Sequence, residues 1–263
     1  MSLFKTKFNL YKSGINTYLH FKYGFFTFFF RFIGFAVIEF LTYGFIIKTY
    51  ANNSLALKEV LVVYSIVAVL FRMQQGVGGE FIAARDRGEY IFNSVSPMSF
   101  FDWVVITSVV NFFYSFFTYI SMLIAAIVFF EINIFISLKI IIICYFLTAL
   151  FGICVGVVAA SVVLANGYFA DMLAWGIPGV LFIFSGAFIP LRVLPRWMQY
   201  IANIMPTSSL YDFLRDFIKN DIFHWGLLGK SICVLLCWAL FSSIIYKLAL
   251  KIFKIRGRAS IIL

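Results

Sequence analysis

The chain of 263 residues is 63% hydrophobic and 21% aromatic, whereas only 12% of its residues are charged. Charged residues make up about 25% of an ordinary soluble protein, so this composition excludes a typical soluble domain and indicates an integral membrane protein. Lysine and arginine outnumber the acids by 21 to 11, which gives a net charge of +10. We attribute the excess to loops that face an anionic inner leaflet rather than to nucleic acid, for which the sequence holds no motif.

The first predicted element is an amphipathic helix over residues 4–20. Polar residues occupy one side, and apolar residues recur on the other at steps of four and three, at Phe4, Phe8, Tyr11 and Ile15. A helix with this pattern lies in the membrane interface. The alternative is a plain tether that precedes the first span. No removable signal peptide is expected, because no compact apolar segment is followed by a small-residue cleavage site.

Apolar runs predict six membrane spans and an all-α integral membrane fold, since a spanning helix needs about 20 residues. The expected second span ends in a Gly-rich turn at residues 76–79. The fourth has a small-residue face at residues 152–161, which would let another helix approach closely. The six ranges are 23–47, 57–78, 102–130, 136–164, 172–190 and 226–250.

Three ionisable residues fall within the first two spans, namely Arg31, Glu39 and Arg72. Arg31 and Glu39 are eight positions apart, so they lie on nearly the same helix face and can point to a protein interior rather than to lipid. Two interpretations stay open. These residues contact a substrate or a gate, or they are paired or snorkelling groups that hold helices together.

The segment from Glu80 to Pro97 concentrates charge between two apolar runs, with five charged residues in ten positions. Such a cluster sits in water or against a partner. After Gly88, apolar side chains are spaced along one helical face up to a Ser-Pro stop, which predicts a short amphipathic helix with an exposed apolar side. We interpret it as a docking element. The alternative is a solvated connecting loop.

Between residues 190 and 221, proline breakers alternate with apolar pieces of about ten residues. Pieces this short cannot cross a bilayer and are too apolar to float free, so the pattern predicts a re-entrant or interfacial helix pair. We expect Pro190, Pro195 and Pro206 to set the breaks. Arg215 is expected to pair with Asp212, Asp216 or lipid phosphate. The alternative is a surface loop shaped by the same prolines.

Six spans place both termini on one side of the membrane. Lysine and arginine number eleven on that side and eight on the other, with two inside spans. The positive-inside rule therefore predicts that both termini and the segment 80–97 are cytoplasmic and that the helix pair at 190–221 faces outward.

Motifs of catalysis are missing from the sequence. It has no Walker-type phosphate loop, no GxSxG or HExxH motif and no pair of histidines at metal-ligand spacing. We therefore expect no enzymatic activity, no metal site and no cofactor on this chain. The four cysteines lie in apolar runs and are expected to be buried free thiols.

Two stretches carry a family resemblance. Residues 85–97 read RDRGEYIFNSVSP, and residues 185–215 read SGAFIPLRVLPRWMQYIANIMPTSSLYDFLR. They resemble the cytoplasmic element between spans two and three, and the Ser-Gly, Pro, Leu-Pro, Pro-Thr and Arg series between spans five and six, of the ABC-2 type permeases. These are the six-span membrane subunits of type V ABC exporters. Tyr90 and Ile91 depart from the pattern, because the family often has leucines after the acidic residue.

The resemblance implies one domain over residues 1–263 in the cell (inner or cytoplasmic) membrane. The permease would work with two ABC ATPase subunits, which would bind ATP and magnesium, and with a second permease copy or a close relative, among membrane lipid. The implied ATPase-coupling helix is 85–97, with Arg85, Asp86, Arg87, Gly88, Glu89, Tyr90 and Phe92. The implied re-entrant motif comprises Gly186, Pro190, Pro195, Pro206 and Arg215.

Three functions follow from these features. The first is the permease of an ATP-driven exporter for an amphipathic small molecule, a drug or a lipid-like substrate. The second is an exporter of a lipid-linked polysaccharide or glycan. The third, of another class, is an ATP-independent channel or carrier with Arg31, Glu39 and Arg72 as the ion path. The two halves lack the paired broken helices of inverted-repeat carriers, which disfavours the third.

Overall fold

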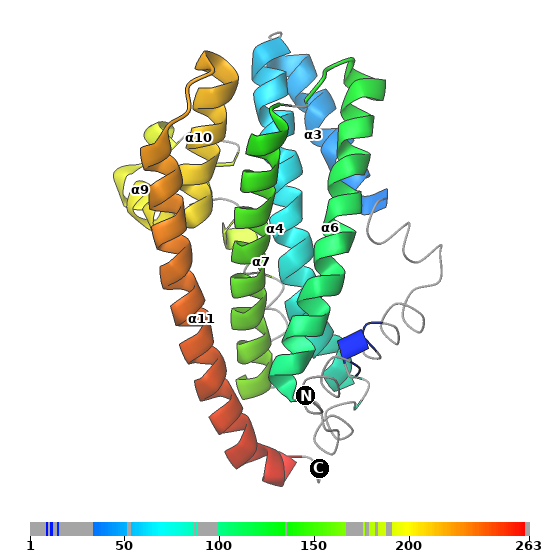
Figure 1. Cartoon of the computed structure of the whole chain (residues 1–263), viewed down its shortest axis with the longest axis vertical. Helices are drawn as coiled ribbons and strands as arrows, with labels where there is room; N and C mark the ends of the chain where they lie inside the picture. The colour runs from blue at the N-terminus through cyan, green and yellow to red at the C-terminus, as the bar shows by residue number, and fades with distance from the viewer. Residues whose placement is uncertain are drawn as a thin grey trace.

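The computed structural model describes residues 34–51, 54–86, 88, 99–134, 136–166, 176, 179–181, 184–187 and 191–260, together with residues 9, 11, 12 and 15. The elements of this part of the chain are helices (Figure 1), as expected. They are α3 (Phe35–Ala51), α4 (Ser54–Asp86), α6 (Phe100–Phe130), α7 (Leu138–Asn166), η3 (Leu191–Val193), α9 (Arg196–Asn203), α10 (Pro206–Asn220) and α11 (Trp225–Ser260).

Four helices of the described part are long and apolar enough to cross a membrane, namely α4, α6, α7 and residues Trp225–Ile255 of α11. They overlap the second, third, fourth and sixth expected spans. The 17-residue helix α3 covers the end of the expected first span, whose residues 23–33 lie outside the described residues. Only scattered residues of the expected fifth span are described. Six spans therefore stay a prediction.

The long helices run side by side along the long axis of the molecule (Figure 1). Helix α4 contacts α3, α6, α7 and α10, whereas α11 packs on α7 and α10. We call the two ends of this bundle the Asp86 end and the Ser54 end, after the two ends of α4. Helices α4, α7 and α11 finish at the Asp86 end and α6 starts there, whereas α10 lies toward the Ser54 end (Figure 1).

Helix α4 continues through the glycines that were expected to end it. The predicted turn at residues 76–79 is wrong, because the helix runs on to Asp86. A Cβ on Gly76 would lie 2.0 Å from Cγ of Asn111 on α6, and a Cβ on Gly78 would lie 2.9 Å from Cβ of Ala159 on α7. The glycines thus serve close helix packing rather than chain reversal.

The small-residue face at residues 152–161 lies against α4, as the sequence predicts for a close helix contact. A Cβ on Gly152 would be 2.5 Å from Cβ of Met73, and a Cβ on Gly156 would be 2.7 Å from Cβ of Val77. Because no side chain separates the two backbones at these points, α4 and α7 approach closely enough to form extensive van der Waals contact.

Helix α6 begins at a reciprocal cap. The backbone N–H of Asp102 donates to Oγ of Ser99 over 3.2 Å, and the backbone N–H of Ser99 donates to the Asp102 carboxylate over 2.9 Å. This capping box satisfies N–H groups that the first turn leaves without helical acceptors. At the other end Glu131 adopts a left-handed conformation, with φ of 56°, and ends the helix.

The short helices η3, α9 and α10 occupy the region expected to hold a re-entrant pair. Pro195 is the N-cap residue of α9, and Pro206 opens α10, where its missing N–H costs no helical hydrogen bond. With eight and 15 residues, α9 and α10 are too short to span a bilayer. Phe213 on α10 is buried among residues of α4 and α7, while Trp197 on α9 is 60% exposed. Entry into the membrane stays a prediction.

Helix α11 presents much of its surface outward. In its most apolar stretch only 22% of the residues are buried. Cys144 and Cys154 on α7 are buried as expected, but Cys233 and Cys237 on α11 are exposed. The expectation of four buried thiols is wrong for these two, because a lipid-facing surface is as apolar as a protein core and the sequence does not distinguish them.

Candidate functional site

The expected coupling segment starts as the end of α4. Arg85 and Asp86 lie in the last turn of that helix, with Nη2 of Arg85 2.7 Å from Oδ1 of Asp86. Gly88 adopts φ of 69° and its N–H donates to the carbonyl of Arg85 over 2.8 Å. A left-handed glycine of this kind closes a helix C-terminus. The remaining coupling residues, Arg87, Glu89, Tyr90 and Phe92, lie outside the described residues.

The polar segment starts later than the sequence predicts, because Glu80 belongs to the bundle. It is a helical residue of α4 and only 2% exposed. The charged segment that leaves the bundle therefore starts at Arg85 rather than at Glu80.

The N-terminal segment is joined to the Asp86 end through Tyr11. The hydroxyl of Tyr11 donates a hydrogen bond to the Asp102 carboxylate, which also caps α6. That hydrogen bond, together with burial and the nearby negative charge, raises the pKa of Tyr11. Ile15 is half-buried, and Phe4 and Phe8 lie outside the described residues. Tyr11 therefore attaches the segment of the predicted interfacial helix to the start of α6.

A buried charge cluster lies toward the Ser54 end, centred on Arg215 of α10. Its Nε lies 3.0 Å from Oε1 of Glu59 on α4, and its Nη1 lies 3.3 Å from Oδ1 of Asp212. Its Nη2 donates to the carbonyls of Gly186 and of Ala187, the latter over 2.6 Å. Arg215 thus binds three separate parts of the chain, which a planar guanidinium with five N–H donors can do at once.

Glu59 binds a second cation. Nζ of Lys219 lies 2.9 Å from its Oε2, so each carboxylate oxygen of Glu59 contacts a positive group. Glu59 is 9% exposed and Arg215 is 5% exposed. Burial of such charges is costly unless they are paired and hydrogen-bonded, and this cluster of two acids and two bases meets that condition.

Glu39, one of the expected intramembrane polar residues, joins α3 to α4. The hydroxyl of Tyr64 on α4 donates to Oε2 of Glu39 on α3 over 3.1 Å, and the rings of Tyr43 and Tyr64 lie 5.2 Å apart. Arg72 is half-buried, two turns further along α4. Arg31 lies outside the described residues. For Glu39 this favours the role of a partner that joins helices.

The sequence reasoning missed Glu59, the residue that ties α4 to Arg215. It falls two positions inside the expected second span, where a carboxylate is unusual. This unusual position of a carboxylate is the feature of the sequence that could have identified Glu59. The contact of Tyr11 with Asp102 had no such signal, because 91 positions separate the two residues.

Comparison with known families completes the description of the site. Residues 5–218 match the family model described as ABC-2 type transporter. The matched region includes α3, α4, α6, α7 and α9 and nearly all of α10. It therefore includes Glu59, Asp212 and Arg215 of the charge cluster and the Asp86 end of α4, whereas Lys219 lies one residue beyond it. No curated protein matches the chain.

Proposed function

Because the chain belongs to the ABC-2 type transporter family, we propose that it is the permease subunit of an ATP-driven exporter of the type V class. Its substrate is an amphipathic small molecule, a drug or a lipid-like molecule. Four helices of spanning length and composition make it a multi-pass membrane protein. The proposed domain covers residues 1–263, beyond the matched 5–218.

The continuity of α4 carries the proposed mechanism. The helix has 33 residues and is therefore about 50 Å long. One end holds Arg85 and Asp86, next to the proposed coupling segment, and the first turns at the other end hold Glu59 in the Arg215 cluster. A displacement at the coupling segment would move α4 as a rigid body and change its contact with α10.

The proposed partners follow from what this chain lacks. Its sequence has no Walker-type phosphate loop, so hydrolysis is assigned to two ABC ATPase subunits that bind ATP and magnesium. A second permease copy, or a close relative, completes the path. We place the Asp86 end in the cytoplasm and the α9 and α10 pair on the outer side, because the lysines and arginines are densest near the two termini.

The proposed coupling residues are Arg85, Asp86, Arg87, Gly88, Glu89, Tyr90 and Phe92. Co-purification of the ATPase tests this assignment and identifies the partner. We expect Tyr90→Asp and Phe92→Asp to abolish co-purification, because a charge in an apolar docking face costs several-fold in affinity or more. The matched control is Tyr200→Asp on α9, a 73% exposed tyrosine that should leave ATPase binding intact. Unchanged assembly in both coupling variants would contradict the assignment.

Transport by reconstituted vesicles separates the remaining functions. An exporter requires the ATPase and ATP for flux. Flux from this chain alone would instead show a channel or carrier. Stimulation of ATP hydrolysis by a lipid-linked glycan, and not by amphipathic small molecules or lipids, would identify a glycan exporter.

A further inference from the structure

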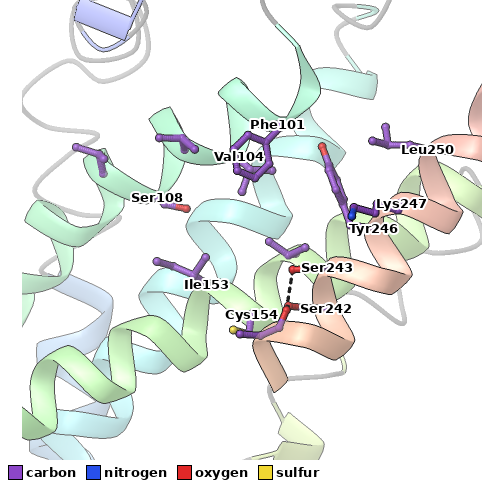
Figure 2. Close-up of a pocket in the computed structure, with 14 residues that line it drawn as sticks. Phe101, Val104, Ser108, Ile153, Cys154, Ser242, Ser243, Tyr246, Lys247 and Leu250 are labelled. Carbon is purple, nitrogen blue, oxygen red and sulfur yellow. Dashed lines mark hydrogen bonds between the residues drawn. The ribbon is translucent and has the colours of Figure 1, made fainter. Parts of the chain in front are cut away.

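A cavity of about 680 Å³ lies between α6, α7 and α11 (Figure 2). Helix α7 contributes Ile153, Cys154 and Val157, and the neighbouring helices contribute mainly apolar side chains. At the Asp86 end α6 and α11 meet through Phe100 and Phe253, whose ring centroids are 5.5 Å apart. The volume is in the range of about 300–1,000 Å³ that is usual for ligand pockets.

Two buried hydroxyls in this apolar lining have no hydrogen-bond partner in the described part of the chain. They are Oγ of Ser108 on α6 and the hydroxyl of Tyr246 on α11, in residues that are 8% and 6% exposed. Figure 2 shows Tyr246 reaching from α11 toward the start of α6. Buried polar atoms are nearly always satisfied, so two unpartnered hydroxyls are unusual beside this apolar lining.

The third polar feature is Lys247, which lines the cavity and is exposed. No carboxylate of the described residues forms an ion pair with it. Between Lys230 and Lys247 α11 has no charged residue over a distance of about 25 Å, close to the thickness of the hydrocarbon core. Lys247 therefore stands at the membrane boundary, where lipid phosphates lie.

From these features we propose that the cavity binds an anionic phospholipid. One acyl chain occupies the apolar cavity from the level of Lys247 to that of Ala239, about 12 Å along α11. The phosphate lies at Lys247, the exposed cation of the lining. An acyl chain gains little on moving from bilayer to apolar cavity, so the preference among lipids comes from Lys247.

The test measures lipid retention by native mass spectrometry on the full chain. The purified protein is offered phosphatidylglycerol and phosphatidylcholine with identical acyl chains. One lysine near the charged surface contributes about fivefold in affinity, so Lys247→Gln should lower the preference for phosphatidylglycerol about fivefold relative to wild type. Lys251→Gln, one turn further on α11 and not in the cavity lining, should leave it unchanged. Equal preferences in wild type and Lys247→Gln would overturn the proposal.

A second pair of variants tests the cavity itself. Val109→Trp fills it from α6 at a 40% exposed position, which should tolerate the larger side chain, and should abolish retention of the bound lipid. Ile142→Phe adds bulk at an exposed position of α7 outside the cavity and should retain the lipid. Retention by Val109→Trp, or displacement of the lipid by inorganic phosphate alone, would refute the acyl-chain site. The measurement needs no ATPase. Failure to retain the lipid would therefore not contradict the proposed exporter function, and failure to bind an ATPase would not contradict the lipid site.

Discussion

Oε1 of Glu59 lies 3.0 Å from Nε of Arg215, and this contact joins the first turns of α4 to the middle of α10. Both residues are more than nine-tenths buried. Because Lys219 and Asp212 complete the cluster, the charges are balanced within it. The pair therefore ties the long helix α4 to α10, one of the short helices that follow the fifth expected span.

Glu59→Gln should destabilise the fold. In the described part of the chain Arg215 would keep only the 33% exposed Asp212 as an acidic partner, and breaking a buried ion pair costs up to about 3–5 kcal/mol. Thermal unfolding of the purified protein in detergent measures the loss. Lys219→Gln is the matched control, because the lysine contacts the same carboxylate but is 42% exposed and should cost less than about 1 kcal/mol. A loss in Glu59→Gln as small as that expected for Lys219→Gln would show that the buried contact with Arg215 does not stabilise the fold.

Gly152→Ala should separate α4 from α7. The added Cβ would lie 2.5 Å from Cβ of Met73 and 3.0 Å from the carbonyl of Leu70, and overpacking of this kind costs about 1–3 kcal/mol. Gly229→Ala on α11 meets nothing within 4 Å and should be neutral or stabilising by up to about 1 kcal/mol. Unfolding midpoints that fall in both variants would indicate a general intolerance of alanine instead of a helix contact.

Gly88→Ala tests the closing turn of α4. A Cβ there would meet no atom within 4 Å, so the cost is backbone strain alone, about 1–2 kcal/mol. We expect ATP-driven transport to fall, because the chain would leave α4 in another direction. Gly88→Asn should retain more activity, since asparagine adopts the left-handed conformation more readily. Equal transport by both variants in vesicles would argue against a role for this turn.

The contact of Tyr11 with Asp102 should depend on pH. Hydrogen bonding to the carboxylate raises the pKa of Tyr11 above its ordinary value of 10.0, so the folded protein holds this proton more tightly. The stabilising contribution is therefore complete below about pH 10 and decreases as the pH rises above it. The difference between tyrosinate absorbance titrations of wild type and Tyr11→Phe measures this pKa.

Asp102→Asn provides the control for that titration. It removes the negative charge and should return the Tyr11 midpoint toward 10.0. A wild-type midpoint at or below the ordinary value would contradict the contact.

Much of the fold could be predicted from residue patterns. Long apolar runs located α6 and α7 to within two residues at each end, because polar residues bound each run. Prolines placed the starts of α9 and α10, because proline cannot continue a preceding helix. The turn predicted from the glycines at residues 76–79 is wrong, because glycine occurs both in turns and in close helix contacts.

The sequence by itself determined that this is a helical membrane protein, where its proline breaks before α9 and α10 fall and which family it resembles, since composition and local spacing carry that information. It also singled out Arg215. Only the tertiary structure showed that Arg215 binds Glu59 across the bundle, that Tyr11 reaches Asp102, and that α6, α7 and α11 enclose a cavity beside Lys247. These depend on how distant helices pack. In a membrane that packing is set by small-residue contacts and polar pairs rather than by hydrophobicity, which is nearly uniform along the chain.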